Sequence, residues 1–396
     1  MNKPLLAAAA AAALAAAPIA AISSPADAAD EIRIGMITTL SGPGSGLGID
    51  IRDGFLLGLE HVGGGLGGLA TVVVEGDDQR EPDIAVQLAE RMVERDQVDV
   101  VTGIVWSNLA LAVAPRLFRN EVLFVSPNAG PSILAGERCD PHFFNVAWQN
   151  DNNHEAMGKH VADAGYESAF ILAPNYPAGQ DALAGFKRFY DGEIAGEVYT
   201  QLGQQDYAAE IARIQSADPS SVYFFLPGGM GINFIKQYDQ AGLKDRIPMF
   251  GPAFSFSQDI LPAVGDSALG VANTAQWSPD LDNDANARFV AAFEEAYGRV
   301  PSLYASQGYD AALLLDAAVE AVDGAIEDTE AFIAALETAE FDSVRGPFRF
   351  NTNHFPIQNY YLREVVARDD GTLTNRVVAT IFEDHGDAYA ADCPME

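Results

Sequence analysis

The chain has 396 residues and carries 23 lysine and arginine residues against 56 aspartate and glutamate residues, a formal net charge of −33 at neutral pH. Such a charge repels a phosphate backbone and argues against nucleic acid as a partner. We interpret the acidity as a surface property that favours solubility. After the first 28 residues no stretch of eighteen uncharged apolar residues follows, so the sequence predicts no membrane-spanning helix there.

The first 28 residues have the layout of a secretory signal peptide. A charged start at Lys3 precedes an alanine-rich apolar run, and the segment ends in the small-residue motif Ala26-Asp27-Ala28. Pro18 interrupts the apolar run, which makes it a poor permanent anchor. We predict cleavage after Ala28 and export of the remaining chain. The alternative is an alanine-rich leader with no targeting role.

The chain contains two cysteines, Cys139 and Cys393. In an exported protein a lone pair of cysteines favours a disulfide over a metal site, which would need more ligands. The bridge would tie the end of the chain back to its first half and constrain the unfolded chain by roughly 5 kcal/mol. Two free thiols are the alternative.

Short apolar runs alternate with longer amphipathic runs, a pattern typical of strands and crossover helices in a parallel sheet. The first series predicts strands at 31–40, 70–76, 98–105 and 123–127, with helices at 48–62, 83–95 and 108–118. The second predicts strands at 169–174, 197–202, 221–227 and 248–252, with helices at 179–190, 207–215 and 231–241. Helices at 284–297 and 304–322 and a hairpin of strands at 345–351 and 358–367 follow. The repetition predicts two α/β lobes of similar construction.

In open α/β sheets, ligands bind beyond the carboxyl ends of the strands, where loops and helix N-termini present unpaired N–H groups. The turns that follow the expected strands lie at Ser41, Ser107, Pro127, Pro174, Pro227 and Pro252. If two such sets of turns face each other, they form a cleft between the lobes.

No motif in the sequence indicates catalysis or a metal. His154 and His160 are six residues apart and do not share the helix face that an HExxH zinc site needs. The glycines between 42 and 48 lack the GxGxxG spacing and predict a tight strand-to-helix turn. The acidic groups at 77–78 and 280–284 are interpreted as solvated loops. The sequence therefore predicts a binding protein without cofactor or metal, and not an enzyme.

Several segments resemble the branched-chain amino-acid binding proteins of ABC transporters. In the order of that family they are TTLSGPGSGLG with IDIRDG, GIVWSNLALAVAP, FVSPNAGPSIL, FFNVAWQNDNNH, NYPAGQDALAGF and FGPAFS. The resemblance covers nearly the whole chain after residue 28. It implies the fold of a type I periplasmic binding protein, with two Rossmann-like lobes whose parallel sheets are joined by three crossover strands.

The resemblance also implies a division of the chain. Residues 29–148 with 279–350 would form lobe 1, and residues 149–278 with 351–385 would form lobe 2. Residues 386–396 would form a C-terminal tail that the Cys139–Cys393 bridge ties to lobe 1.

In that family a serine hydroxyl at the start of a helix and backbone groups in the loop after the next strand hold the carboxylate of the ligand. Here those positions match Ser107 and residues 128–130, at a helix start that favours anions. The residues that the resemblance places around the ligand are Leu47, Trp106, Ser107, Asn108, Asn128, Ala129, Gly130, Tyr176, Gly229, Met230, Phe254 and Trp277.

One departure from the family changes the expected ligand. Amino-acid-binding relatives keep an acidic residue near the last turn of the second lobe, where this chain has Ala253, Phe254 and Ser255. A buried ammonium group without a carboxylate would be costly. The chain is thus similar to the branch that binds aromatic carboxylates such as benzoate or hydroxycinnamate derivatives. Ordinary core packing is the alternative role for its aromatic side chains.

The resemblance implies a periplasmic, monomeric solute-binding protein that closes on a small carboxylate and delivers it to an ABC permease in the inner membrane. The alternatives are a binding protein for branched-chain or other amino acids or amides, and a ligand-sensing receptor of the same fold.

Overall fold

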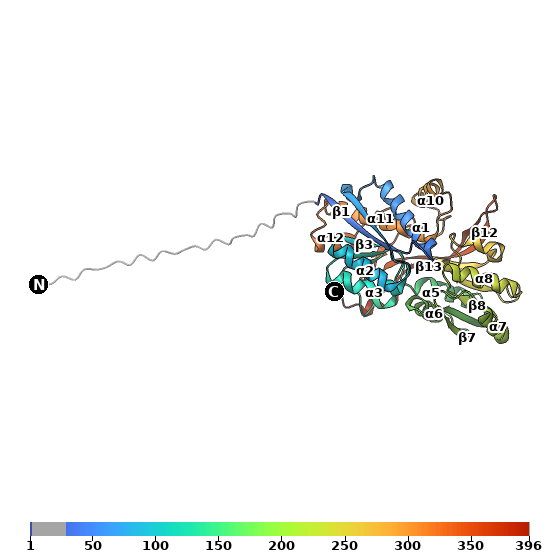
Figure 1. The fold of residues 1–396 in the computed structure, drawn as a ribbon. Coiled ribbons are helices and arrows are strands. Elements are labelled where there is room, and N and C mark those ends of the chain that lie inside the picture. The colour runs from blue at the N-terminus through green and yellow to red at the C-terminus, as the bar shows by residue number, and fades with distance from the viewer. Residues whose placement is uncertain (2–28, 396) are drawn as a thin grey trace.

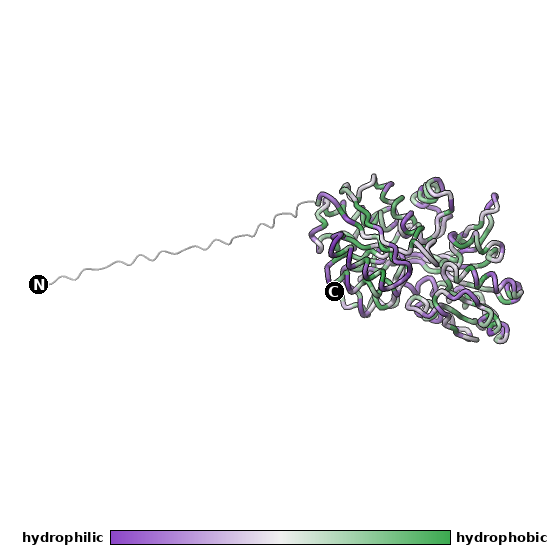
Figure 2. The backbone as a smooth tube through the Cα atoms, in the orientation of Figure 1, coloured by the Kyte–Doolittle hydropathy of each residue, from purple (hydrophilic) through white to green (hydrophobic). Residues whose placement is uncertain are grey.

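The computed structural model describes residue 1 and residues 29–395. The predicted signal peptide lies outside these residues. Two sheets, each covered by helices, form two bodies that lie side by side (Figure 1). Apolar segments run through the interior of both bodies, and hydrophilic segments lie mainly on the outer helices and loops (Figure 2). None of the helices described has the length and apolar character that crossing a membrane requires.

The first sheet is parallel and has the strand order β2-β1-β3-β4-β5. Its strands are β1 (Glu31–Thr38), β2 (Ala70–Asp77), β3 (Val100–Thr102), β4 (Leu123–Ser126) and β5 (Phe143–Asn145). The helices of this body are α1 (Ser45–His61), α2 (Pro82–Glu94), α3 (Ser107–Arg119), α4 (Ser132–Ala135), α11 (Leu303–Ala321) and α12 (Thr329–Glu337). Helix α1 packs closely on α11, because Gly54 has no side chain to collide with the backbone of Ala305.

The second sheet has the order β11-β12-β10-β9-β8-β6-β7, with β13 paired to β12. Its parallel strands are β6 (Ser168–Pro174), β7 (Glu193–Thr200), β8 (Ser221–Phe224), β9 (Met249–Pro252) and β10 (Ala272–Ala275). Its antiparallel strands are β11 (Arg349–Phe350), β12 (Pro356–Ala367) and β13 (Leu373–His385). The helices here are α5 (Asn152–Asp163), α6 (Pro177–Phe189), α7 (Ala208–Ala217), α8 (Gly229–Gln240) and α9 (Leu261–Val264), and α10 (Asp284–Tyr297) leads back to the first body.

The predicted α/β fold with two lobes is confirmed, with one correction to the second sheet. That sheet is mixed, because β12 runs antiparallel to β10 and pairs over most of its length with β13. The strand predicted at 345–351 as the hairpin partner of β12 is only the two-residue strand β11. Strand β13 was not predicted, although its mainly apolar and β-branched run at 377–382 favours a strand; it is an edge strand, half-buried or exposed along most of its length.

The chain passes between the two sheets three times, after β5, after β10 and after α12. A buried arginine, Arg345 in the passage after α12, links that passage to the passage after β5 and to α11. Arg345 donates to Asp310 at 3.0 Å and to the carbonyl of Ala147 at 2.9 Å. Separating a buried pair is strongly unfavourable, because it leaves an uncompensated charge. These contacts of Arg345 therefore hold together the segments that connect the two bodies. The lobe boundaries given above stay predictions.

The predicted disulfide is present between Cys139 and Cys393, 254 residues apart. The tail also contacts the second body, where the hydroxyl of Tyr389 donates to Asp151 at 2.8 Å and accepts from Arg188 at 3.1 Å. The tail therefore lies across the junction of the two bodies.

We predict that the double variant Cys139→Ser with Cys393→Ser has a free energy of unfolding lower by up to about 5 kcal/mol. Without the bridge, the unfolded chain regains the conformational entropy that closing this very long loop removes. Urea unfolding of variant and wild type under non-reducing conditions measures the difference. Equal stability would show that the bridge constrains nothing.

Candidate functional site

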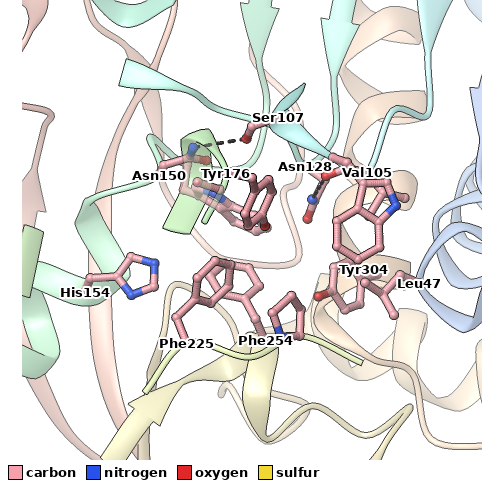
Figure 3. Close-up of a pocket in the computed structure, with 14 residues that line it drawn as sticks. Leu47, Val105, Ser107, Asn128, Asn150, His154, Tyr176, Phe225, Phe254 and Tyr304 are labelled. Atoms are coloured by element: carbon pink, nitrogen blue, oxygen red, sulfur yellow. Dashed lines mark hydrogen bonds between the residues drawn. The ribbon is translucent and has the colours of Figure 1, made fainter. Parts of the chain in front are cut away.

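A cavity lies between the two bodies, at the carboxyl ends of the parallel strands of both sheets (Figure 3). Its lining comes from the loops after β3, β4, β5, β6, β8 and β9 and from the first turns of α1, α3, α5, α6 and α11. The lining residues are Leu47, Val105, Trp106, Ser107, Asn128, Trp148, Asn150, His154, Tyr176, Ala178, Phe225, Pro227, Phe254 and Tyr304. This position is where open α/β sheets bind ligands.

The ligand cavity is narrow. The free space between the side chains, including its opening to solvent, is about 360 Å³. Ligand pockets usually hold about 300–1,000 Å³, so this cavity suits a small, flat occupant unless the two bodies separate slightly.

The polar side of the cavity is formed by Ser107, Asn128 and Asn150. Ser107 is the first residue of α3, and its hydroxyl accepts a hydrogen bond from Asn150 Nδ2 at 3.1 Å. The amide of Asn128 donates to the carbonyl of Val105 at 2.5 Å, which leaves its Oδ1 buried and without a partner among the described residues. The first N–H groups of α3 and its dipole add positive potential on this side.

Aromatic rings form the opposite walls of the cavity. Tyr176 and Phe225 are nearly parallel, with an interplanar angle of 18° and ring centres 6.3 Å apart. Phe254 contacts the ring of Trp148 edge to face at 4.6 Å and that of Phe225 at 5.5 Å. These contacts hold large flat surfaces toward the cavity, as Figure 3 shows for Tyr176, Phe225 and Phe254.

The titratable groups of the cavity are neutral near pH 7. Burial lowers the pKa of His154 to about 3, and its Nδ1 is hydrogen-bonded to the hydroxyl of Tyr223. Burial also raises the pKa of Tyr176 and of Tyr304 well above the usual value, so both hydroxyls stay protonated. Neither hydroxyl has a hydrogen-bond partner within residues 29–395, so both can donate to a ligand.

A chain of hydrogen bonds behind the cavity fixes its polar side. Asn150 donates to Asp181 on α6 at 2.9 Å, and Asp181 accepts from the backbone N–H and the hydroxyl of Ser132 at 3.0 and 2.7 Å. Burial raises the pKa of Asp181, although these donors oppose the shift. Because Asp181 and Ser132 belong to different bodies, this contact also links the two bodies.

A second chain of hydrogen bonds fixes Trp106. Its indole N–H donates to Thr39 at 3.0 Å, and the Thr39 hydroxyl donates to Asp78 at 2.6 Å. The expectation that Asp77 and Asp78 both lie in a solvated loop is wrong for Asp78, which is fully buried. Asp77 binds the backbone N–H of Leu40 at 2.9 Å.

The structure brings six of the twelve predicted ligand residues together at the cavity: Leu47, Trp106, Ser107, Asn128, Tyr176 and Phe254. Gly229 and Met230 line an adjoining cavity. The remaining four, Asn108, Ala129, Gly130 and Trp277, do not line the ligand cavity.

Backbone and core contacts account for three of these four. The carbonyl of Ala129 accepts from Ser126 and Asn145, and the N–H of Gly130 donates to Asn150, so these groups support the cavity from behind. Trp277 is fully buried, donates to Asn286 at 2.7 Å and packs as a core residue.

Pro227 was predicted only as one of the strand-end turns that face the cleft. Sequence reasoning missed seven other lining residues: Val105, Trp148, Asn150, His154, Ala178, Phe225 and Tyr304. Asn150 and His154 belong to the polar run after β5, whose position at a strand end was a usable signal. Phe225 could have been found in the same way, as the residue that follows β8. No local signal marks Tyr304, because α11 reaches the cavity only through the tertiary fold.

Residues 31–372 match the periplasmic binding protein family. The chain belongs to this family. A solved solute-binding protein of an ABC transporter from R. palustris, in complex with benzoate, is 32% identical with a TM-score of 0.87, over 92% of this chain and 99% of that one. Another, from Rhodopseudomonas palustris BisB5 with 3,4-dihydroxybenzoic acid, is 30% identical with a TM-score of 0.86, over 91% and 99%.

A curated relative of this periplasmic binding protein, the Leu/Ile/Val-binding protein homolog 6 of Brucella melitensis, is 29% identical over 92% of this chain and 95% of its own. The family and the solved neighbours are solute-binding proteins of ABC transporters, which bind small molecules and deliver them to a membrane permease, and are not enzymes.

His154 makes the stability of the protein depend on pH. Its folded pKa of about 3 lies below the unfolded value of 6.5, so the unfolded chain takes up the proton first as the pH falls. The contribution of His154 is fully present above about pH 6.5 and is lost as the pH falls toward 3. We predict that His154→Gln flattens the fall in unfolding free energy between these pH values, by up to about 1.4 kcal/mol per pH unit.

Denaturant unfolding at several pH values measures that slope, with the exposed His61→Gln as the matched control. If both variants keep the slope of the wild type, His154 is not buried as a neutral side chain.

Proposed function

We propose that this periplasmic binding protein serves an ABC importer and that its ligand is a small aromatic carboxylate of the benzoate type. The observation that carries the proposal is the chemistry of the ligand cavity. Its walls are aromatic, its polar groups are mainly neutral donors, and no aspartate or glutamate of residues 29–395 lines it. A flat ring fits this narrow space and its flat walls better than a branched side chain does.

The carboxylate would lie against Ser107 and the start of α3. The hydroxyl of Ser107 can donate to the ligand while it accepts from Asn150. The unpaired N–H groups and the dipole of the helix stabilise an anion without a cationic side chain. The hydroxyls of Tyr176 and Tyr304 are further donors around the same cavity.

An α-amino acid would bring an ammonium group into the same space. Among the residues that the structure describes, no carboxylate lines the cavity to accept this group, and an unpaired buried ammonium group is strongly unfavourable. The curated relatives are named for leucine, isoleucine and valine, and these amino acids are therefore the second candidate ligands. The benzoate and dihydroxybenzoate complexes of the solved neighbours support the aromatic acids.

A hydroxyl group on the ring would use the remaining polar atom of the cavity. Asn128 Oδ1 is a buried acceptor without a partner in the described part of the chain, and such a group costs about 1–3 kcal/mol when it stays unpaired. A phenolic hydroxyl can donate to it, so we propose that hydroxybenzoates are preferred over benzoate.

Closure of the two bodies would bury the ligand and present one closed shape to the permease. We propose that the protein acts in the periplasm as a monomer, after removal of its first 28 residues. A sensory receptor that signals to another protein is the alternative role. It would share the ligand cavity and differ in its partner.

We predict that benzoate and 4-hydroxybenzoate raise the melting temperature of the purified protein, since a ligand at a hundred times its Kd stabilises the folded state by about 2.7 kcal/mol. Leucine at the same concentration should leave the melting temperature unchanged. A shift with leucine and none with either aromatic acid would contradict the proposed ligand class.

We also predict that Ser107→Ala weakens benzoate binding about tenfold to a hundredfold, the loss of one hydrogen bond to a charged group. Isothermal titration calorimetry measures the change in Kd. The exposed Ser216→Ala is the matched control and should bind as the wild type does. Unchanged affinity in Ser107→Ala would remove this hydroxyl from the site.

A further inference from the structure

A second cavity adjoins the ligand cavity. Trp106 and Pro227 line both, so these two side chains form part of the wall between them. The second cavity has about 330 Å³ of free space, including its opening to solvent. It lies between the two bodies, with Arg80 on one side and Gly203 and Met230 on the other, and we call it the Arg80 crevice.

Arg80 is the one charged side chain among the described residues that line either cavity, since His154 is neutral. Its guanidinium group makes no hydrogen bond or ion pair with any residue of 29–395. In a chain with a net charge of −33, acidic partners are abundant. An arginine that faces a crevice and has no acidic partner there is available to bind an anion from solution.

The turn that carries Arg80 has a strained backbone. Gln79 and Arg80 have φ angles of 52° and 63°, in the left-handed region that costs non-glycine residues about 1–3 kcal/mol each. The carboxylates of Asp77 and Asp78 hold this turn by accepting the N–H groups of Gln79 and Arg80 at 3.0 and 2.8 Å. Asp77 and Asp78 thus bind the backbone N–H groups of this turn and not the guanidinium group of Arg80.

Asp78 also positions Trp106, which forms one wall of the Arg80 crevice. Asp78 accepts from Thr39, which in turn accepts from the indole of Trp106. The guanidinium carbon of Arg80 lies 5.7 Å from the centre of the Trp106 ring, within the range of a cation–π contact. Asp78 therefore fixes both the turn that carries Arg80 and the ring of Trp106, beside which a ligand would pass.

The second body adds to the positive potential. Gly229 is the first residue of α8, and it lines the crevice together with Met230. The start of a helix favours an anion. Arg80 also lies close to the second body, because a side-chain carbon added at Gly203 would come within 3.2 Å of its Nη2.

We propose that the Arg80 crevice is a second, transient anion-binding subsite, which captures the carboxylate of the ligand before the ligand passes Trp106 into the ligand cavity. The proposal rests on the proposed function, because it assumes an anionic ligand. A strongly acidic protein repels such a ligand at long range, and a cation at the rim of the site offsets this repulsion locally. Charges at the rim act mainly on the association rate.

Stopped-flow tryptophan fluorescence tests the subsite, since Trp106 and Trp148 line the ligand cavity. We expect Arg80→Gln to lower the association rate constant of benzoate by about tenfold and Arg80→Lys to restore most of it. The rate for uncharged benzamide should not change between wild type and Arg80→Gln. Added salt should narrow the difference for benzoate, because it screens the charge of Arg80.

The exposed Arg119→Gln removes the same charge far from the crevice and is the matched control. An Arg80→Gln rate within twofold of the wild type, or an equal loss for benzamide and benzoate, would overturn the subsite. A wild-type protein that binds no aromatic carboxylate at equilibrium would contradict the proposed function itself, whereas intact benzoate binding with an unchanged rate in Arg80→Gln contradicts the subsite alone.

Discussion

A carboxylate can be held in a closed cavity without a cationic side chain only if neutral donors are fixed in place before the ligand arrives. Donors that must reorganise lose part of their interaction energy to the ordering of side chains. In this protein Ser107 begins a helix, and Asn150 holds its hydroxyl from behind. The polar side of the cavity therefore depends on backbone geometry and on one amide.

This constraint explains where the buried carboxyl groups lie. Asp181 is one step behind the ligand cavity, and it joins Asn150 to Ser132 of the first body. Asp78 is likewise one step behind Trp106. Arg345 joins Asp310 of α11 to the carbonyl of Ala147 in the passage after β5. The lining of the cavity is uncharged, while carboxyl and guanidinium groups behind it fix its walls, so the proposed selectivity depends on the kind of donor and the shape of the space.

Much of the fold follows from the sequence because the repeated strand and helix pattern is local. The parallel strands β1 to β4 and β6 to β9 obey it, whereas the short parallel strands β5 and β10 were not predicted. The repetition of the pattern predicted the two lobes, and the resemblance to a known family supplied the three crossings between them. Neither α5 nor β13 was predicted. The first turns of α5 bury polar residues such as Asn152 and Asn153, so this helix lacks the expected apolar period. Strand β13 is a largely exposed edge strand, but its mainly apolar run at 377–382 was a usable signal.

The candidate site was predictable where residues follow a strand directly, as Ser107 and Tyr176 do. Asn150 and Phe225 also follow strands, so their positions carried a usable signal, whereas Tyr304 reaches the cavity only through the way the two bodies meet, which no local pattern encodes. The Arg80 crevice could not be predicted, because it also depends on how the two bodies meet. Arg80 follows an acidic pair that suggested a solvated loop, and only the packing of Asp78 shows that the turn is held rigidly.

The most direct measurement is a crystal structure of the protein with benzoate bound. The carboxylate should lie within hydrogen-bond distance of the Ser107 hydroxyl and the first N–H groups of α3, with the ring between Tyr176 and Phe254. A benzoate that turns its carboxylate away from α3, or that lies outside the ligand cavity, would contradict recognition of the anion by neutral donors.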